Sequence, residues 1–141
     1  MLYGQDRNQM RQMFFDVWQR HKQGLPLPAM ETIIAQVIEM HPEYHDFLDN
    51  PDSNTDKDFT PEMGQSNPFL HLGLHIAIKE QLNINQPPGI VDEYRRLSAR
   101  VNDPHDVEHE IMECLAQSVW EAQRNQTMPD NSAYIDCIKK R

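Results

Sequence analysis

The spacing of the apolar residues constrains the fold of this chain most, because they recur three and four positions apart in successive segments. Between residues 6 and 21 the apolar positions i, i+3, i+4, i+7 and i+8 are Met10, Met13, Phe14, Val17 and Trp18. Residues 30–38 repeat the spacing with Met30, Ile33, Ile34, Val37 and Ile38, and His41 follows on the same stripe. Such stripes are typical of amphipathic helices. We therefore predict an all-α fold.

Helix start and stop signals divide the rest of the chain. Gly24 ends the first helix, because glycine readily takes the left-handed conformation that closes a helix. Asn67-Pro68 and Asp103-Pro104 each place a capping side chain before a proline, which favours helix starts there. The first of these helices runs through FLHLGLHIAIKEQL and is apolar nearly all round, so we expect it to be central. The second runs to about residue 124 and is the longest.

Shorter elements complete the expected architecture. Pro42 interrupts the second helix, so HPEYHDFL is either a kink or a fresh short helix. Two more short helices are expected near residues 90–101 and after Pro129-Asp130. At 141 residues the chain has the size of one domain. We predict one domain over 1–141, a compact bundle of about five or six helices.

Residues 49–66 form a polar, acidic, proline-containing stretch that predicts a long surface loop. Its acidic residues suggest calcium binding, but the glycine at loop position six and the closing glutamate of an EF-hand are missing. A solvated linker is the preferred interpretation.

Charge and hydropathy exclude some classes of partner. The 13 basic and 22 acidic residues give a net charge of -9, which opposes binding to nucleic-acid phosphates. No apolar run approaches the roughly 18 residues of a membrane span. The start, MLYGQDRNQM, lacks the features of a signal peptide. We expect a cytoplasmic protein without a nucleic-acid or membrane partner, forming either a homodimer or a complex with an unidentified protein.

The two cysteines, Cys114 and Cys137, fall in expected helices and have no CxxC spacing. Neither a disulfide framework nor a thiolate zinc site is indicated. We therefore expect two reduced, buried thiols.

Four stretches of the sequence carry a family resemblance that covers nearly the whole chain: GQDRNQMRQMF, HPEYH, NPFLHLGLHIAIKEQ and EHEIMECLAQSVWEAQRN. Together they resemble the domain of unknown function 1841, a family of short bacterial proteins. The resemblance implies a bacterial protein. The family has no established activity, so the resemblance assigns no catalytic residues.

Histidines at helical spacing are the strongest chemical signal. His71 and His75 stand four apart on the expected central helix, so both imidazoles face one side and could bind one metal ion. His105 and His109 repeat this spacing on the longest helix. His41 and His45 would form a third pair if the helix continued through Pro42.

We predict one transition-metal ion, zinc, iron or nickel, bound between the central and the longest helix. Its simplest ligand set is His71, His75, His109 and one carboxylate, Glu113 or Glu108; His105 and His45 are further candidate ligands. The order His-x-x-Glu-His at 105–109 does not match the Glu-x-x-His pairs of di-iron bundles. The run 109–113 is a poor metalloprotease motif, because glutamate replaces the second histidine of HExxH.

The alternative interpretation makes the histidines structural. They would form hydrogen bonds in the core of a helical interaction module, and the acidic loop or a surface stripe would contact a partner protein. The sequence defines no substrate or reaction under either interpretation, so enzymatic activity is left open.

Overall fold

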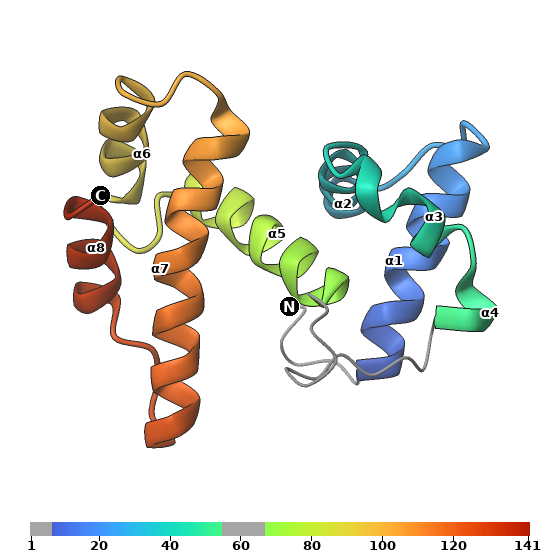
Figure 1. Cartoon of the computed structure of the whole chain (residues 1–141). Helices are drawn as coiled ribbons and strands as arrows, with labels where there is room; N and C mark the ends of the chain where they lie inside the picture. Colours follow the sequence, from blue (N-terminus) through green and yellow to red (C-terminus); the bar gives the residue numbers. More distant parts are fainter. Residues whose placement is uncertain (1–6, 55–66) are drawn as a thin grey trace. The chain divides into compact units, whose positions relative to one another are not determined.

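The computed structural model describes residues 7–54 and 67–141, and within these ranges it contains helices and no β-strand (Figure 1). The all-α prediction is confirmed. The elements in chain order are α1 (Arg7–Lys22), α2 (Ala29–Glu39), the 3-10 turn η2 (Pro42–Tyr44), α3 (His45–Leu48), α4 (Pro51–Asn54), α5 (Pro68–Ile84), α6 (Ile90–Ser98), α7 (Pro104–Asn125) and α8 (Asn131–Lys139).

The described residues hold eight α-helices, which is more than the five or six expected. The difference lies in the short elements around 42–54. Pro42 starts a 3-10 turn, α3 follows it directly, and α4 forms one further turn at the start of the predicted acidic loop. The rest of that loop, residues 55–66, lies outside the described residues.

The predicted helix ends are confirmed by their hydrogen bonds. Gly24 has a φ of 75°, and the N–H groups of Gly24 and Leu25 bond to the carbonyl oxygens of His21 and Arg20 at 3.0 and 3.1 Å. This is the Schellman pattern that closes a helix. The Asn67 side chain accepts from the N–H groups of Phe69 and Leu70 and caps α5.

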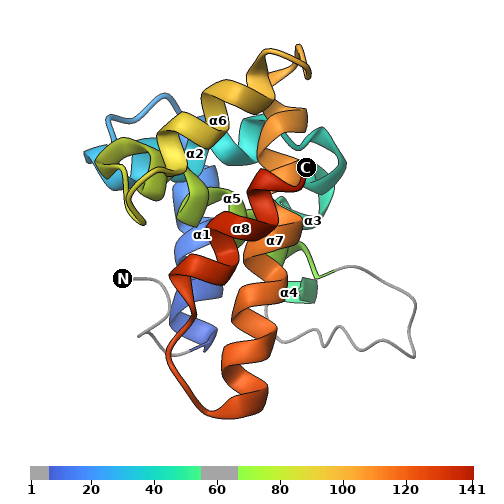
Figure 2. The ribbon, with the colours of Figure 1, turned by 90° about the vertical axis from the view of Figure 1, so that its left-hand side faces the viewer.

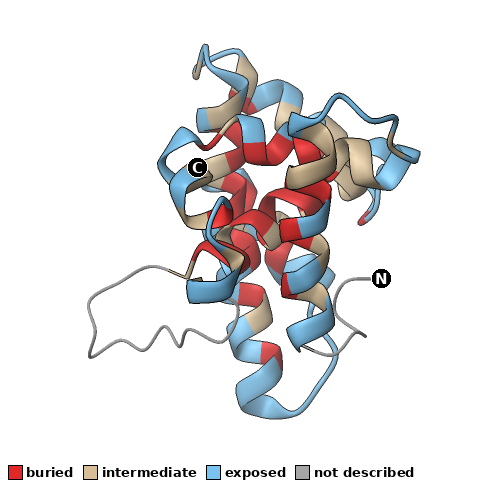
Figure 3. Cartoon of the chain, turned by 90° about the vertical axis from the view of Figure 1, so that its right-hand side faces the viewer, coloured by how far each residue is buried: buried red, intermediate tan, exposed pale blue. Residues whose placement is uncertain are grey.

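The chain divides into two compact units, and it passes from the first to the second after Ile76, inside α5. The expectation of one domain stays a prediction. In the first unit, apolar faces of α1, α2, α3 and the start of α5 form one buried cluster, as the helical spacing predicts. Figure 3 shows buried and exposed residues alternating along the helices. The cluster consists of Phe14, Phe15, Val17, Trp18, Ile34, Ala35, Val37, Ile38, Leu48, Phe69, Leu72 and Ile76.

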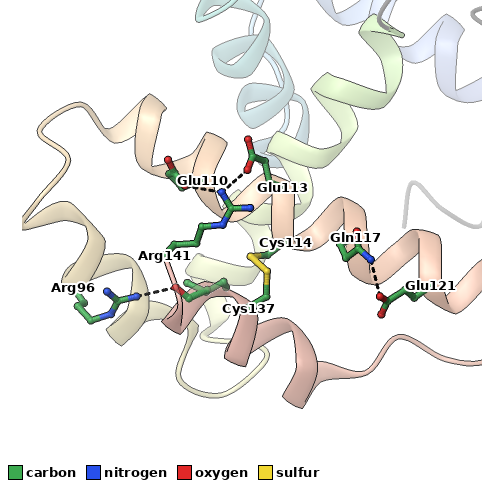
Figure 4. Close-up of a disulfide and its surroundings, with 9 residues drawn as sticks. Arg96, Glu110, Glu113, Cys114, Gln117, Glu121, Cys137 and Arg141 are labelled. Atoms are coloured by element: carbon green, nitrogen blue, oxygen red, sulfur yellow. Dashed lines mark hydrogen bonds and ion pairs between the residues drawn. A yellow bond between two sulfur atoms is a disulfide. The ribbon is translucent and has the colours of Figure 1, made fainter. Parts of the chain in front are cut away.

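The second unit packs α6, α7 and α8 together, and α8 runs back alongside α7 (Figure 2). A disulfide joins Cys114 of α7 to Cys137 of α8 (Figure 4). The prediction of two reduced thiols was therefore wrong. The Cα atoms lie 5.8 Å apart, within the range that a disulfide can bridge. This proximity arises from the packing of the two helices, which cysteine spacing does not reveal.

No helix in the described ranges has both the length and the apolar character needed to cross a membrane.

Candidate metal centre

His41 lies between the end of α2 and Pro42, the first residue of η2. The side chain is only 1% exposed. Its Nδ1 lies 2.7 Å from the carbonyl oxygen of Val37. Because a carbonyl oxygen only accepts, Nδ1 donates, and in the neutral imidazole Nε2 then carries the lone pair. A backbone carbonyl that fixes the tautomer in this way is typical of metal-binding histidines.

His71 and His75 stand one turn apart on α5, as predicted. His75 is completely buried, whereas His71 is half-buried. Their ring centroids are 4.9 Å apart. Leu72 and Ile76, which follow each histidine, belong to the apolar cluster and orient this part of α5 toward the core of the first unit.

Three of the imidazoles in the first unit, those of His41, His71 and His75, form one cluster, which we call the His41/His71/His75 cluster. The Nε2 atoms of His41 and His71 are 3.1 Å apart, and with His41 in its neutral Nδ1–H tautomer His71 is the donor. Ligand atoms of His41 and His75 lie within 4.8 Å of each other. Two imidazole nitrogens on one tetrahedral metal ion would be about 3.3 Å apart, given metal–nitrogen bonds of about 2.0–2.1 Å. The Nε2 atoms of His41 and His71 are therefore close enough to bind one ion, and the ring of His75 lies beside both.

Tyr44 of η2 borders this cluster. Its ring stacks on His41 with centroids 5.5 Å apart and stands edge-on to His71 at 5.9 Å. Burial raises the pKa of the Tyr44 phenol, and the neighbouring negative charge of Glu43 raises it further. The phenol is therefore neutral near pH 7.

His45, a predicted ligand, lies apart from this cluster. Its Nε2 is 2.9 Å from the carbonyl oxygen of Ile38, and its ring lies 4.4 Å from that of Trp18 on α1. The helix does not continue through Pro42, so His41 and His45 do not share a face. The structure brings His41, rather than His45, to His71 and His75. The signal that identifies His41 is its place on the apolar stripe of α2.

The second unit contains the other predicted pair, His105 and His109, one turn apart on α7. Both are half-buried, their ring centroids are 4.2 Å apart, and their ligand atoms lie within 4.8 Å of each other. The N-cap bond from the His105 N–H to the Asp103 side chain fixes the start of this helix. The pairing expected from the sequence is present.

The two candidate carboxylate ligands contact basic side chains within the second unit. Glu108 is completely buried, and Lys79 donates to it at 2.8 Å. Glu113 is exposed and pairs with Arg141, which also contacts Glu110 (Figure 4). The hydrogen bond to Glu113 raises the pKa of Arg141 most, and the contact with Glu110 raises it further. Both predicted carboxylate ligands thus form ion pairs in the structure, and their role as metal ligands stays a prediction.

The fold and the clustered imidazoles define an all-helical protein with histidines grouped at metal-binding distance. The family model described as Domain of unknown function (DUF1841) matches residues 6–140, so the chain belongs to this family, as its sequence stretches predict. No curated protein and no solved structure matches the chain.

Proposed function

We propose that this protein binds one transition-metal ion, zinc, iron or nickel, and that the His41/His71/His75 cluster provides its ligands in the first unit. The observation that carries the proposal is the pair of Nε2 atoms 3.1 Å apart, on His41 and His71. The Nδ1 bond of His41 to Val37 supports it, because it leaves Nε2 as the metal-binding atom. Neutral imidazole is the commonest protein ligand of such ions.

Binding would need one change of tautomer. His71 uses its Nε2 proton to bond to His41 in the structure. To hold an ion at that position, both Nε2 atoms would offer lone pairs, and His71 would carry its proton on Nδ1 instead. The imidazoles of the cluster would stay neutral, and imidazole nitrogen suits zinc, iron and nickel.

The ligands expected from the second unit are also part of the proposal. The sequence predicts that histidines of the longest helix, His109 and His105, bind the same ion. This is a prediction from their spacing, and metal content of the double variant H105Q/H109Q tests it. A bacterial origin, a cytoplasmic location, and the lack of a nucleic-acid or membrane partner are further expectations. The Cys114–Cys137 disulfide bears on the expected cytoplasmic location, because disulfides of cytosolic proteins are usually transient and serve catalysis or redox sensing.

The test is elemental mass spectrometry on protein purified without a histidine tag and without chelator, followed by zinc titration of the apo form. We expect close to one ion per chain in the wild type. In H71Q, affinity should fall more than about 100-fold, beyond the 10–100-fold loss typical of a group that only orients a ligand. The matched control is H21Q, since His21 contacts Glu39 and lies outside the cluster. A folded wild-type protein that binds neither zinc, iron nor nickel would refute the proposal.

A protein-interaction module is the second candidate, favoured by Trp120. This α7 side chain is 53% exposed, and the Arg124 guanidinium lies 5.3 Å from its ring centroid. Exposed tryptophan with arginine is typical of interaction surfaces. Sedimentation analysis of wild type and W120A tests this candidate: a wild-type assembly, either a homodimer or a complex with a partner protein, should weaken in W120A, whereas identical profiles without assembly would count against it.

A further inference from the structure

We propose that Tyr44 is a positioning residue of the metal centre: its ring holds the imidazoles of His41 and His71 in the orientation in which both Nε2 atoms reach one ion. This inference rests on the proposed function. It assigns to Tyr44 a role that the histidine spacing alone does not suggest.

The local sequence explains why Tyr44 reaches His41. Pro42 starts the 3-10 turn η2, and the Tyr44 N–H bonds to the carbonyl oxygen of His41 at 2.9 Å. A 3-10 helix has three residues per turn, so side chains three apart lie in line. The turn therefore places the ring of Tyr44 over that of His41, and the planes are only 10° from parallel.

The same ring also contacts the second ligand. It stands at 72° to His71, with centroids 5.9 Å apart, while His41 and His71 stand at 80° to each other. Stacked and edge-to-face arrangements are the favoured geometries of ring pairs at these distances. One aromatic side chain thus limits the rotation of two imidazoles that come from segments 30 residues apart.

Tyr44 can be altered without removing a ligand. It is half-buried and packs at the border of the apolar cluster, as Phe47 does. Phe47 contacts the rings of Phe15 and Phe69. F47L is therefore a matched control for the loss of one aromatic ring at this border. Y44F keeps the ring and removes only the hydroxyl, and Y44L keeps apolar volume without a ring.

The experiment measures zinc affinity and the visible absorption of the Co²⁺ form for wild type, Y44F, Y44L and F47L. We expect Y44F to match the wild type in both measurements. Y44L should bind zinc at least about tenfold more weakly, as for other groups that orient a ligand, and its Co²⁺ spectrum should change. F47L should lower thermal stability and leave the affinity and the spectrum unchanged.

Three results would overturn the inference in distinguishable ways. If Y44L matched the wild type, the ring would have no positioning role, and the proposed function would stand. If Y44F lost as much affinity as Y44L, the hydroxyl would be the acting group instead. If the wild type bound neither zinc nor Co²⁺, the proposed function itself would fail, and this inference with it.

Discussion

The first unit is held by stacked rings and aliphatic side chains, whereas the second adds a disulfide and a buried carboxylate–lysine ion pair to its apolar contacts. Phe69 illustrates the first: its ring contacts Phe14, Phe15 and Phe47, and the Arg11 guanidinium lies 4.4 Å from its centroid. The second contains the disulfide and the Glu108–Lys79 pair. The two units thus depend on different interactions, and substitutions in one unit or the other can measure each contribution to stability.

The largest effect is expected for F69A. Removing a buried ring leaves a cavity and should lower the free energy of unfolding by about 3–5 kcal/mol. Urea denaturation measures this loss. The matched control is L70A, because the neighbouring Leu70 is 56% exposed and should change stability little. Equal losses in the two variants would contradict the assignment of Phe69 to the core.

The next largest effect is expected for the disulfide. The double variant C114S/C137S should lose about 3 kcal/mol, since a cross-link between residues 23 apart restricts the unfolded chain. Urea denaturation with hydrogen exchange would locate the loss, which we expect in α8. A dithiol reductant should reproduce the effect in the wild type and leave the double variant unchanged. Faster hydrogen exchange in α1 instead of α8 would contradict the view that the disulfide stabilises the second unit.

A smaller effect is expected for K79M. The substitution takes the lysine partner from the fully buried Glu108 carboxylate and should cost about 1–3 kcal/mol, a typical penalty for a polar group that loses its bond. Thermal unfolding measures this, and K79M/E108Q should recover part of the loss. The control is K22M, whose lysine pairs with Asp49 at the surface. A larger effect of K22M than of K79M would contradict the role of burial.

The smallest effect is expected for D49N, and it depends on pH. Hydrogen bonds from Lys22 and then from Trp18 lower the Asp49 pKa below its usual 3.8. A lowered folded-state pKa means that the charged form stabilises the fold above the unfolded pKa and that this contribution is lost as pH falls through the folded pKa. At pH 7, D49N should lose less than about 1 kcal/mol.

Urea denaturation at several pH values provides the check. The difference between wild type and D49N should be constant at neutral pH and should shrink below pH 3.8. A difference that grew on acidification would contradict the assigned sign.

The sequence predicted the features that depend on neighbouring residues. Gly24 ends α1 and Asn67 begins α5 as expected, because caps follow from side chains within a few positions of the helix end. The pairs His71/His75 and His105/His109 were predictable for the same reason, since residues four apart on a helix share a face.

Features that depend on packing between helices were not predictable in this way. The choice of His41 over His45 depends on the turn after Pro42 and on how α5 packs in the first unit. The Cys114–Cys137 disulfide depends on the alignment of α8 with α7. The ion pairs of Glu108 and Glu113 likewise join residues distant in sequence. The sequence alone therefore does not distinguish the two carboxylates as candidate ligands.

The disulfide also makes a closed covalent ring of the chain between Cys114 and Cys137. The connection from α7 to α8, including the exposed residues 126–130, lies within that ring. A protease that cuts this connection would leave both fragments joined, so the nicked protein would migrate as one species until a reductant separated it. The C-terminal fragment, which carries Arg141, would therefore stay linked to the fragment that contains Glu110 and Glu113.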